Sequence, residues 1–143
     1  MSRILALGLD LVEIGRIAAA LSRHGEAFVE RFCRPGEPAG REGAARAAHL
    51  AGLFAAKEAV LKALGTGWAQ GLGFQQVEIL RAPSGAPAVR LHGRASARAA
   101  ELGVTAIHLS ITHERGHAAA VAVLEGASAR ESAAANPEPT AHA

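Results

Sequence analysis

The order of apolar and polar residues predicts that the chain begins with a strand followed by a helix. The run "ILALGLDLV", residues 4–12, is mostly apolar and is typical of a buried strand, interrupted by Gly8 and Asp10. From about Glu13 the apolar residues recur every three or four positions, which is the period of an amphipathic helix. A break in this helix is expected near Gly25.

The first predicted helix has a basic outer face. At about 100° per residue, Ile14, Ile17 and Leu21 fall on one side of the helix. Arg16 and Arg23 fall on the opposite side. The apolar side is therefore expected to pack on the core, and the two arginines are expected to face solvent.

A longer helix and further strands follow. The helix is expected from about Glu42 to Leu64, where Gly65 ends it as a C-cap glycine. Strand patterns occupy residues 74–81, 88–91, 106–113 and 117–125, and a short helix pattern occupies residues 93–102. From residue 126 onward no large apolar residue occurs. We therefore expect one α+β domain, residues 1–125, and a disordered tail, residues 126–143.

Composition excludes several classes of function. Half of the 143 residues are hydrophobic, which suits one domain with a sizeable core. The formal charge of +2 and the 3% content of aromatic residues give no basis for nucleic-acid binding. The single cysteine, Cys33, excludes an intrachain disulfide and fits a buried hydrophobe in a cytoplasmic protein. No run of about 18 apolar residues predicts a membrane span.

One histidine, His113, closes the strand 106–113 and precedes the turn "ERG". Its side chain is expected at a sheet edge, where a histidine is as a rule structural or solvated. Alternation along this strand predicts two different faces. The apolar face carries Ile107, Leu109 and Ile111, and the polar face carries His108, Ser110 and Thr112.

The long helix has charged residues in an apolar setting. Lys57 falls in the middle of a stripe formed by Leu50, Leu53, Phe54, Leu61 and Leu64. One interpretation is that its stem packs on the core while the ammonium group reaches water. Glu58 and Lys62 are one turn apart, and an ordinary ion pair between them would contribute about 0.2–0.5 kcal/mol.

Asp10 is the second anomaly, because an unpaired carboxylate in a buried strand costs several kcal/mol. It either caps the helix that begins near Glu13, or it joins Glu58 in holding a divalent cation, for which Mg²⁺ with its preference for oxygen ligands is the best candidate. In the second case, positive charge and backbone donors for a phosphate substrate would come from Lys57, Lys62 and the "GTG" of residues 65–67.

Four blocks of the chain, in order, resemble the holo-[acyl-carrier-protein] synthases, the short bacterial group of 4′-phosphopantetheinyl transferases. The blocks are "GLDLVEIGRI" (8–17), "LAGLFAAKEAVLKALGTG" (50–67), "LGFQQVEI" (72–79) and "HLSITHERGHAAAVAVLE" (108–125). The resemblance runs from about residue 4 to residue 125. One departure is "RFCRPGE" for the family's "RILTxxE", with Arg34 in place of the threonine.

The resemblance implies transfer of phosphopantetheine from coenzyme A to a serine hydroxyl of apo acyl carrier protein, in fatty acid biosynthesis, with Mg²⁺ as cofactor. The implied metal ligands and catalytic carboxylates are Asp10 and Glu58, and Glu58 is also the candidate base. Lys62 is the third catalytic residue. The implied coenzyme contacts are Lys62, Gly65, His113 and, inside the same signature, Lys57; Gly85 and Pro87 stand where the family places residues beside the adenine.

The resemblance also implies a fold and partners. The expected fold is one long helix packed on an antiparallel sheet, and the expected assembly is a homotrimer with active sites between subunits. Arg16 and Arg23 lie in the helix that contacts the acidic carrier protein in this family. Two other functions are compatible with the residues: a non-catalytic module that binds coenzyme A or the carrier, and a Mg²⁺-dependent phosphoesterase.

Overall fold

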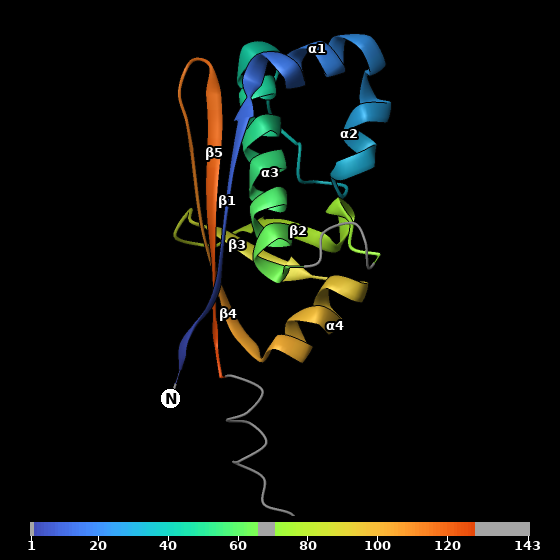
Figure 1. Cartoon of the computed structure of the whole chain (residues 1–143). Coiled ribbons are helices and arrows are strands. Elements are labelled where there is room, and N and C mark those ends of the chain that lie inside the picture. Colours follow the sequence, from blue (N-terminus) through green and yellow to red (C-terminus); the bar gives the residue numbers. More distant parts are fainter. Residues whose placement is uncertain (1, 66–70, 128–143) are drawn as a thin grey trace, which may run out of the picture.

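The helix α3 (Gly43–Leu64) runs through the middle of the molecule, with strands on more than one side of it (Figure 1). This computed structural model describes residues 2–65 and 71–127. The other elements, in chain order, are β1 (Arg3–Glu13), α1 (Ile14–His24), α2 (Glu26–Phe32), the 3-10 helix η2 (Phe74–Gln76), β2 (Val77–Arg81), β3 (Pro87–Leu91), α4 (Gly93–Leu102), β4 (Val104–His113) and β5 (His117–Gly126).

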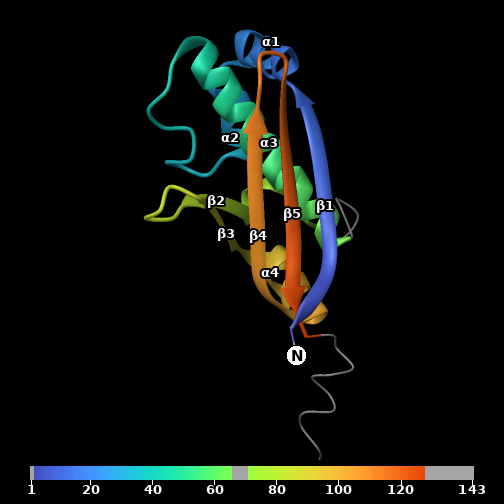
Figure 2. The ribbon, with the colours of Figure 1, turned by 90° about the vertical axis from the view of Figure 1, so that its left-hand side faces the viewer.

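Three antiparallel strands form one sheet in the order β1-β5-β4, and β2 pairs with β3 in a separate hairpin. One face of the three-stranded sheet packs against α3, which confirms the predicted long helix on an antiparallel sheet. Figure 2 shows the other face, with the three strands side by side and α3 behind them. The predicted alternation in β4 is confirmed, because its three apolar residues belong to the core side and its three polar residues are exposed.

Small residues let β1 approach α3 closely. A Cβ atom added to Gly8 would lie 1.8 Å from the carbonyl oxygen of Ala59, so no larger residue fits there without a backbone shift. The neighbouring strand β5 presents three buried alanines to the helix, namely Ala118, Ala120 and Ala122. This close packing carries Asp10, two residues after Gly8, to the surface of α3.

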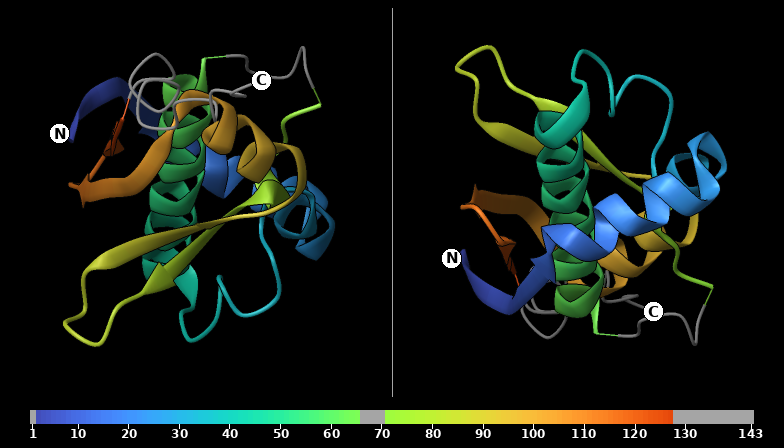
Figure 3. Two further views of the ribbon diagram at one scale, coloured as in Figure 1. Left: turned by 90° about the horizontal axis from the view of Figure 1, so that it is seen from below. Right: turned by 90° about the horizontal axis from the view of Figure 1, so that it is seen from above.

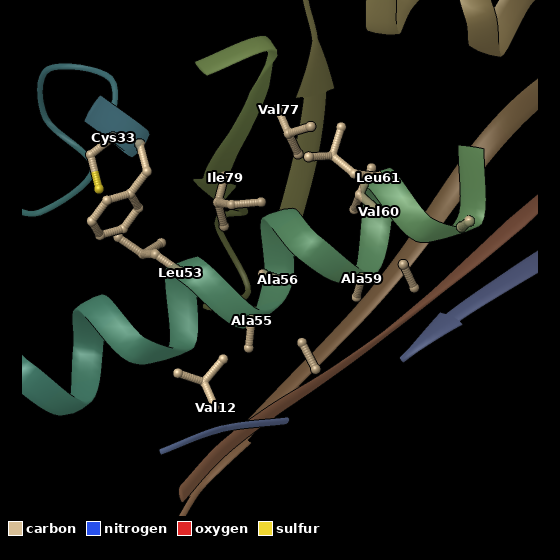
Figure 4. Packing of buried hydrophobic residues seen from close by; sticks show 14 of the residues in the cluster. Val12, Cys33, Leu53, Ala55, Ala56, Ala59, Val60, Leu61, Val77 and Ile79 are labelled. Carbon is tan, nitrogen blue, oxygen red and sulfur yellow. The ribbon is translucent and has the colours of Figure 1, made fainter. Parts of the chain in front are cut away.

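The hairpin reaches α3 from a different direction from the sheet (Figure 3). Figure 4 shows Leu61 of α3 next to Val77 of β2, while Ala55 and Ala59 point towards the sheet. Cys33 is buried in this core, as predicted. Burial in apolar surroundings, reinforced by the charge of Glu37, raises the pKa of its thiol to about 12.

Glycines end or break the helices where the sequence predicts them. Gly25 has a φ of 58° and separates α1 from α2, and Gly65 has a φ of 84° at the end of α3. These backbone angles are costly for residues with a Cβ atom.

The strand predicted over residues 74–81 is wrong for its first three residues, which form η2. Two interactions explain the turn. The Gln76 side chain accepts a hydrogen bond from the Ala95 backbone N–H (2.8 Å), and the carbonyl oxygens of Phe74 and Val77 accept hydrogen bonds from Lys57. The predicted tail lies outside the described residues from position 128, while Gly126 belongs to β5.

The sheet face that points away from α3 is uncovered in the single chain; we call it the outer sheet face. It is apolar on β1 and β5, whereas β4 presents His108, Ser110 and Thr112 there. Its β1 residues Leu7, Leu9 and Leu11 are 64%, 63% and 67% exposed. In the antiparallel pairing of β1 with β5, Val123 lies beside Leu7 and Val121 lies beside Leu9. None of the helices in the described part of the chain is long and apolar enough to cross a membrane.

Candidate active site

Two predicted site residues meet where β1 crosses the C-terminal half of α3. The Lys62 ammonium donates to Asp10 Oδ1 (3.0 Å) and to the carbonyl oxygen of Leu9 (3.1 Å). Asp10 lies in the middle of β1, so the alternative that it caps the next helix is wrong: Glu13 occupies the N-cap of α1, without a side-chain hydrogen bond. Lys62 therefore forms its ion pair with Asp10. An ordinary ion pair within the helix would have joined Lys62 to Glu58.

Glu58 completes this cluster, which we call the carboxylate–lysine group. Partial burial raises the pKa of its carboxyl group, the negative charge of Asp10 raises it further, and Lys62 opposes the shift. Two carboxylates thus share one half-buried place, and a cation there would relieve their repulsion. Among residues 2–65 and 71–127, no three His, Cys, Asp or Glu side chains gather as a metal site. The donor set fits Mg²⁺, which binds through one or two carboxylates and takes its other ligands from water and phosphate.

A second site is a cavity of about 770 Å³ on another side of α3, which we call the hairpin pocket. Its walls are the N-terminal half of α3, the loop of residues 35–41, the β2–β3 hairpin and the end of β4. Three predicted coenzyme neighbours, Gly85, Pro87 and His113, line this one pocket. Its size is that of a pocket for a nucleotide-sized ligand.

The hairpin pocket also has basic residues that no pattern in the sequence indicates, namely Arg41, His49 and Arg81. They come from a loop, a helix and a hairpin, so no spacing in the sequence connects them. Burial lowers the pKa of His49, and the charges of Arg41 and Arg81 lower it further. The backbone carbonyl of Glu37 lies 2.9 Å from His49 Nε2 and opposes this shift.

Within one chain, the carboxylate–lysine group and the hairpin pocket lie on opposite sides of α3. His49 and Glu58 are nine residues apart, which at about 100° per residue is half a turn around the helix axis. Asp10 belongs to β1 and His113 to β4, the two edge strands of the sheet, with β5 between them. The structure therefore divides the predicted site residues into two groups.

Lys57 belongs to neither group, and its ammonium is not placed to contact a phosphate. Its side chain is 0% exposed, and its ammonium lies 2.8 Å from Glu37 Oε2. The interpretation that the ammonium reaches water is therefore wrong, and contact with a coenzyme phosphate is excluded by the same burial.

Gly65 lies at the C-terminus of α3, just beyond Lys62. Arg98 of α4 donates from Nε to the carbonyl oxygen of Leu64 (3.1 Å), so a second cation stands at this helix end. Helix C-termini carry partial negative charge, and a phosphate there requires such compensation. The rest of the "GTG" motif, residues 66 and 67, lies outside the described residues.

Arg16 and Arg23 are exposed on α1, as predicted. They are seven residues apart and so share one face of the helix. The basic face proposed for a partner is therefore open to solvent in the single chain.

Comparisons with known proteins identify the family of the chain. Residues 6–122 match the family model of the 4′-phosphopantetheinyl transferase superfamily. The chain is 54% identical to the holo-[acyl-carrier-protein] synthase of Solidesulfovibrio magneticus over 123 residues, which are 86% of this chain and 99% of the relative. The chain belongs to the 4′-phosphopantetheinyl transferase superfamily.

Solved structures of related proteins share the fold. The holo-[acyl-carrier-protein] synthase of Helicobacter pylori, solved in complex with coenzyme A, is 32% identical with a TM-score of 0.71, and the match covers 82% of this chain and 98% of that one. The synthase of Neisseria meningitidis is 30% identical with a TM-score of 0.76, and the match covers 85% of this chain and 98% of that one.

Proposed function

We propose that the carboxylate–lysine group and the hairpin pocket are two halves of one transferase site, completed between neighbouring copies of the chain. As a member of its family, the chain transfers the 4′-phosphopantetheine group from coenzyme A to apo acyl carrier protein. The observation that carries the proposal is that the carboxylate–lysine group and the hairpin pocket lie on opposite sides of α3. One extended coenzyme needs both a nucleotide pocket and a pyrophosphate site, so the two must come from neighbouring copies.

The carboxylate–lysine group is the part of the site that handles the pyrophosphate. Asp10 and Glu58 would hold Mg²⁺, which when bound neutralises charge on the phosphate oxygens. Lys62, already held by Asp10 at 3.0 Å, places a further positive charge beside the reacting phosphate. Gly65, at the end of the same helix, leaves its backbone open to close approach.

In the transfer itself, the serine oxygen of the carrier attacks the β-phosphorus of coenzyme A. The bond from that phosphorus to the bridging oxygen breaks, and adenosine 3′,5′-bisphosphate leaves. We assign the serine proton to Glu58, taken directly or through a water, because this carboxylate belongs to the group that faces the reacting phosphate. Phosphoryl transfer gains most from positioning and charge neutralisation, which are what Asp10, Glu58 and Lys62 supply.

The hairpin pocket is the part of the site that takes the adenosine end of coenzyme A. Gly85 and Pro87, at the tip of the hairpin, offer a surface without long side chains for the adenine. Arg41 and Arg81, which also line the pocket, supply charge for the phosphate on the ribose. His113, at the end of β4, lines the same pocket, and we assign it to the charge of a coenzyme phosphate.

The outer sheet face is proposed to join the copies as a homotrimer. Its leucines on β1 are more than 60% exposed in the single chain, and burial of apolar area contributes about 25 cal/mol per Å². An uncovered apolar face of this kind marks an interface. Cyclic assembly would set the β1 edge of one copy against the β4 edge of the next.

The basic face of α1 is the proposed docking surface for the carrier protein. Arg16 and Arg23 are exposed, and an acidic partner would be steered towards them. The reaction consumes coenzyme A and a carrier of fatty acid biosynthesis, so we expect it in the cytoplasm, which also suits the unpaired thiol of Cys33.

The test of the reaction is incubation of the protein with coenzyme A, Mg²⁺ and apo acyl carrier protein, followed by intact-protein mass spectrometry. We expect the carrier to gain the mass of one phosphopantetheine, and the gain to disappear when a chelator removes the metal. A non-catalytic binding module would bind coenzyme A without modifying the carrier. A phosphoesterase would cleave coenzyme A in the absence of the carrier. Either result without a mass gain would overturn the assignment.

A further inference from the structure

Lys57 is the one charged side chain that is fully buried among the described residues, at 0% exposure. Its ammonium contacts both oxygens of the Glu37 carboxylate, at 2.8 and 3.0 Å. It also donates to the backbone carbonyl oxygens of Val77 (2.6 Å) and Phe74 (3.2 Å). The three donors of the ammonium are therefore all used by protein groups.

These contacts join three elements that contribute walls to the hairpin pocket. Lys57 belongs to α3, Glu37 to the loop of residues 35–41, and Val77 is the first residue of β2. We propose that Lys57 is a positioning residue, whose buried ammonium holds this loop and β2 against α3 and so fixes the shape of the pocket that receives the coenzyme. This inference rests on the proposed function of the hairpin pocket.

Further hydrogen bonds extend from Glu37 to the pocket. Its carboxylate accepts a hydrogen bond from the backbone N–H of Arg34 (3.0 Å), and its carbonyl oxygen lies 2.9 Å from His49 Nε2. Glu37 and His49 both line the pocket. The position of this carboxylate thus determines both where the loop lies and how a pocket histidine is oriented.

The charge on Lys57 is what holds the loop in place. The Glu37 side chain is only 3% exposed, so a carboxylate left there without its cation would be buried and uncompensated. Such a carboxylate would move towards water, and the loop of residues 35–41 would move with it. A neutral residue at position 57 would therefore reshape the pocket even where the protein stays folded.

The expected defect is specific to coenzyme binding. Lys57 cannot touch substrate, because its ammonium is sealed from solvent and fully partnered. The carboxylate–lysine group on the other side of α3 keeps its own contacts, and Lys62 stays bound to Asp10. A variant of Lys57 should therefore weaken binding of the coenzyme and leave the chemical step at saturating coenzyme almost unchanged.

The experiment compares Lys57→Met, Glu37→Gln and the double variant in the full chain. Calorimetry gives the Kd for adenosine 3′,5′-bisphosphate, and steady-state assays give KM for coenzyme A and kcat. We expect Lys57→Met to raise Kd and KM about tenfold or more, with kcat within about threefold of the unchanged protein. The double variant should be no worse than Lys57→Met, since no buried charge is left unpaired.

Leu124→Ala is the matched control, because Leu124 is fully buried on β5 and does not line the pocket. It should lower the thermal midpoint without raising Kd. If Lys57→Met does not fold, Glu37→Gln alone carries the test, and it too should raise Kd more than Leu124→Ala does. Unchanged Kd and KM in the Lys57 and Glu37 variants, or a loss of kcat with unchanged KM, would overturn the inference.

The same measurements distinguish a wrong role for Lys57 from a wrong assignment of the hairpin pocket as the coenzyme site. Arg81→Gln changes a pocket residue whose guanidinium donates to the carbonyl oxygen of Gly85 (2.9 Å) and not to a partner of Lys57. If Arg81→Gln and Gly85→Val leave the Kd unchanged, the pocket itself is wrongly assigned. If they raise the Kd and Lys57→Met does not, the pocket stands and only the role of Lys57 fails.

Discussion

Asp10 Oδ1 and Lys62 Nζ lie 3.0 Å apart and join β1 to α3 through two residues that are 52 positions apart in the sequence. The pair holds the ammonium beside Glu58, whose pKa is raised by burial and by Asp10. One cation thus balances two carboxylates, and this leaves the site negative enough to attract a metal ion. The first two predictions follow from this arrangement.

Neutralising either carboxylate should abolish metal-dependent transfer without unfolding the protein. We expect Asp10→Asn and Glu58→Gln to lower the transfer rate by at least about a hundredfold, because each removes a ligand and charge aimed at the pyrophosphate. Mass spectrometry of the carrier measures the rate, and circular dichroism checks the fold. Glu13→Gln, an exposed carboxylate at the end of the same strand, is the control. Full activity in either variant would refute the metal assignment.

Asp10 and Lys62 should shift the pKa of Glu58 in opposite directions. Its pKa lies above the ordinary value of 4.5, so in the absence of metal the native state holds this proton more tightly than the unfolded state. Its contribution to stability is then present at low pH and is lost as pH rises through the native pKa. Carboxyl ¹³C NMR should show the Glu58 pKa fall in Asp10→Asn and rise in Lys62→Gln. Equal pKa values in the three proteins would contradict the described coupling.

Metal binding should show the same titration. Because a proton and Mg²⁺ compete for Glu58, the apparent affinity for Mg²⁺ should fall as the pH is lowered. The fall should begin at a higher pH than it would for a carboxylate with an ordinary pKa. In Glu58→Gln this step of the pH profile should be absent.

Gly8→Ala should destabilise the fold and damage the site together. The added Cβ would lie 1.8 Å from the Ala59 carbonyl oxygen, so β1 must move away from α3 and take Asp10 with it. We expect a loss of about 1–3 kcal/mol in the free energy of unfolding, measured by denaturant titration. Gly15→Ala is the matched control, since nothing lies within 4 Å of its added Cβ, and it should be neutral or stabilising. Equal effects of the two substitutions would contradict the close approach.

Much of this site could be predicted from the sequence because its residues break a pattern. Asp10 interrupts an apolar strand, and Lys57 interrupts an apolar stripe, so both stood out as residues that need partners. The partner of Lys57 could not be predicted in this way. Glu37 lies 20 residues earlier, in a loop rich in proline and glycine where apolar residues do not recur at regular intervals. Only the fold brings that loop, β2 and α3 to one point.

The hairpin pocket shows the same limit for a binding site. Gly85, Pro87 and His113 could be predicted from a family resemblance: His113 stands inside a family block, and the other two stand in the turn where the family places residues beside the adenine. Arg41 and Arg81 could not, because a basic residue in a loop or at a hairpin is as a rule a solvated side chain. The extent of η2 was missed for a related reason, since its turn depends on Lys57 rather than on local sequence.

Charge on the outer sheet face should prevent assembly. We expect Leu9→Glu to convert a trimer into monomers, because Leu9 is 63% exposed in the single chain and its burial drives the proposed contact. Light scattering after size-exclusion chromatography gives the mass. Ala97→Glu, an exposed position on α4, should remain trimeric. A trimer that tolerates Leu9→Glu would place the interface elsewhere.

The most direct test of a site shared between copies is complementation between two inactive variants. Asp10→Asn damages the carboxylate–lysine group and leaves the hairpin pocket intact; a variant with Arg41→Glu and Arg81→Glu does the reverse. Equal amounts are unfolded together, refolded as mixed trimers, and assayed for transfer of phosphopantetheine to the carrier. If each site combines the pocket of one copy with the carboxylates of its neighbour, random mixing restores about a quarter of the unmutated activity. Mixed trimers that stay as inactive as either variant alone would show that each chain works by itself, and would contradict the account.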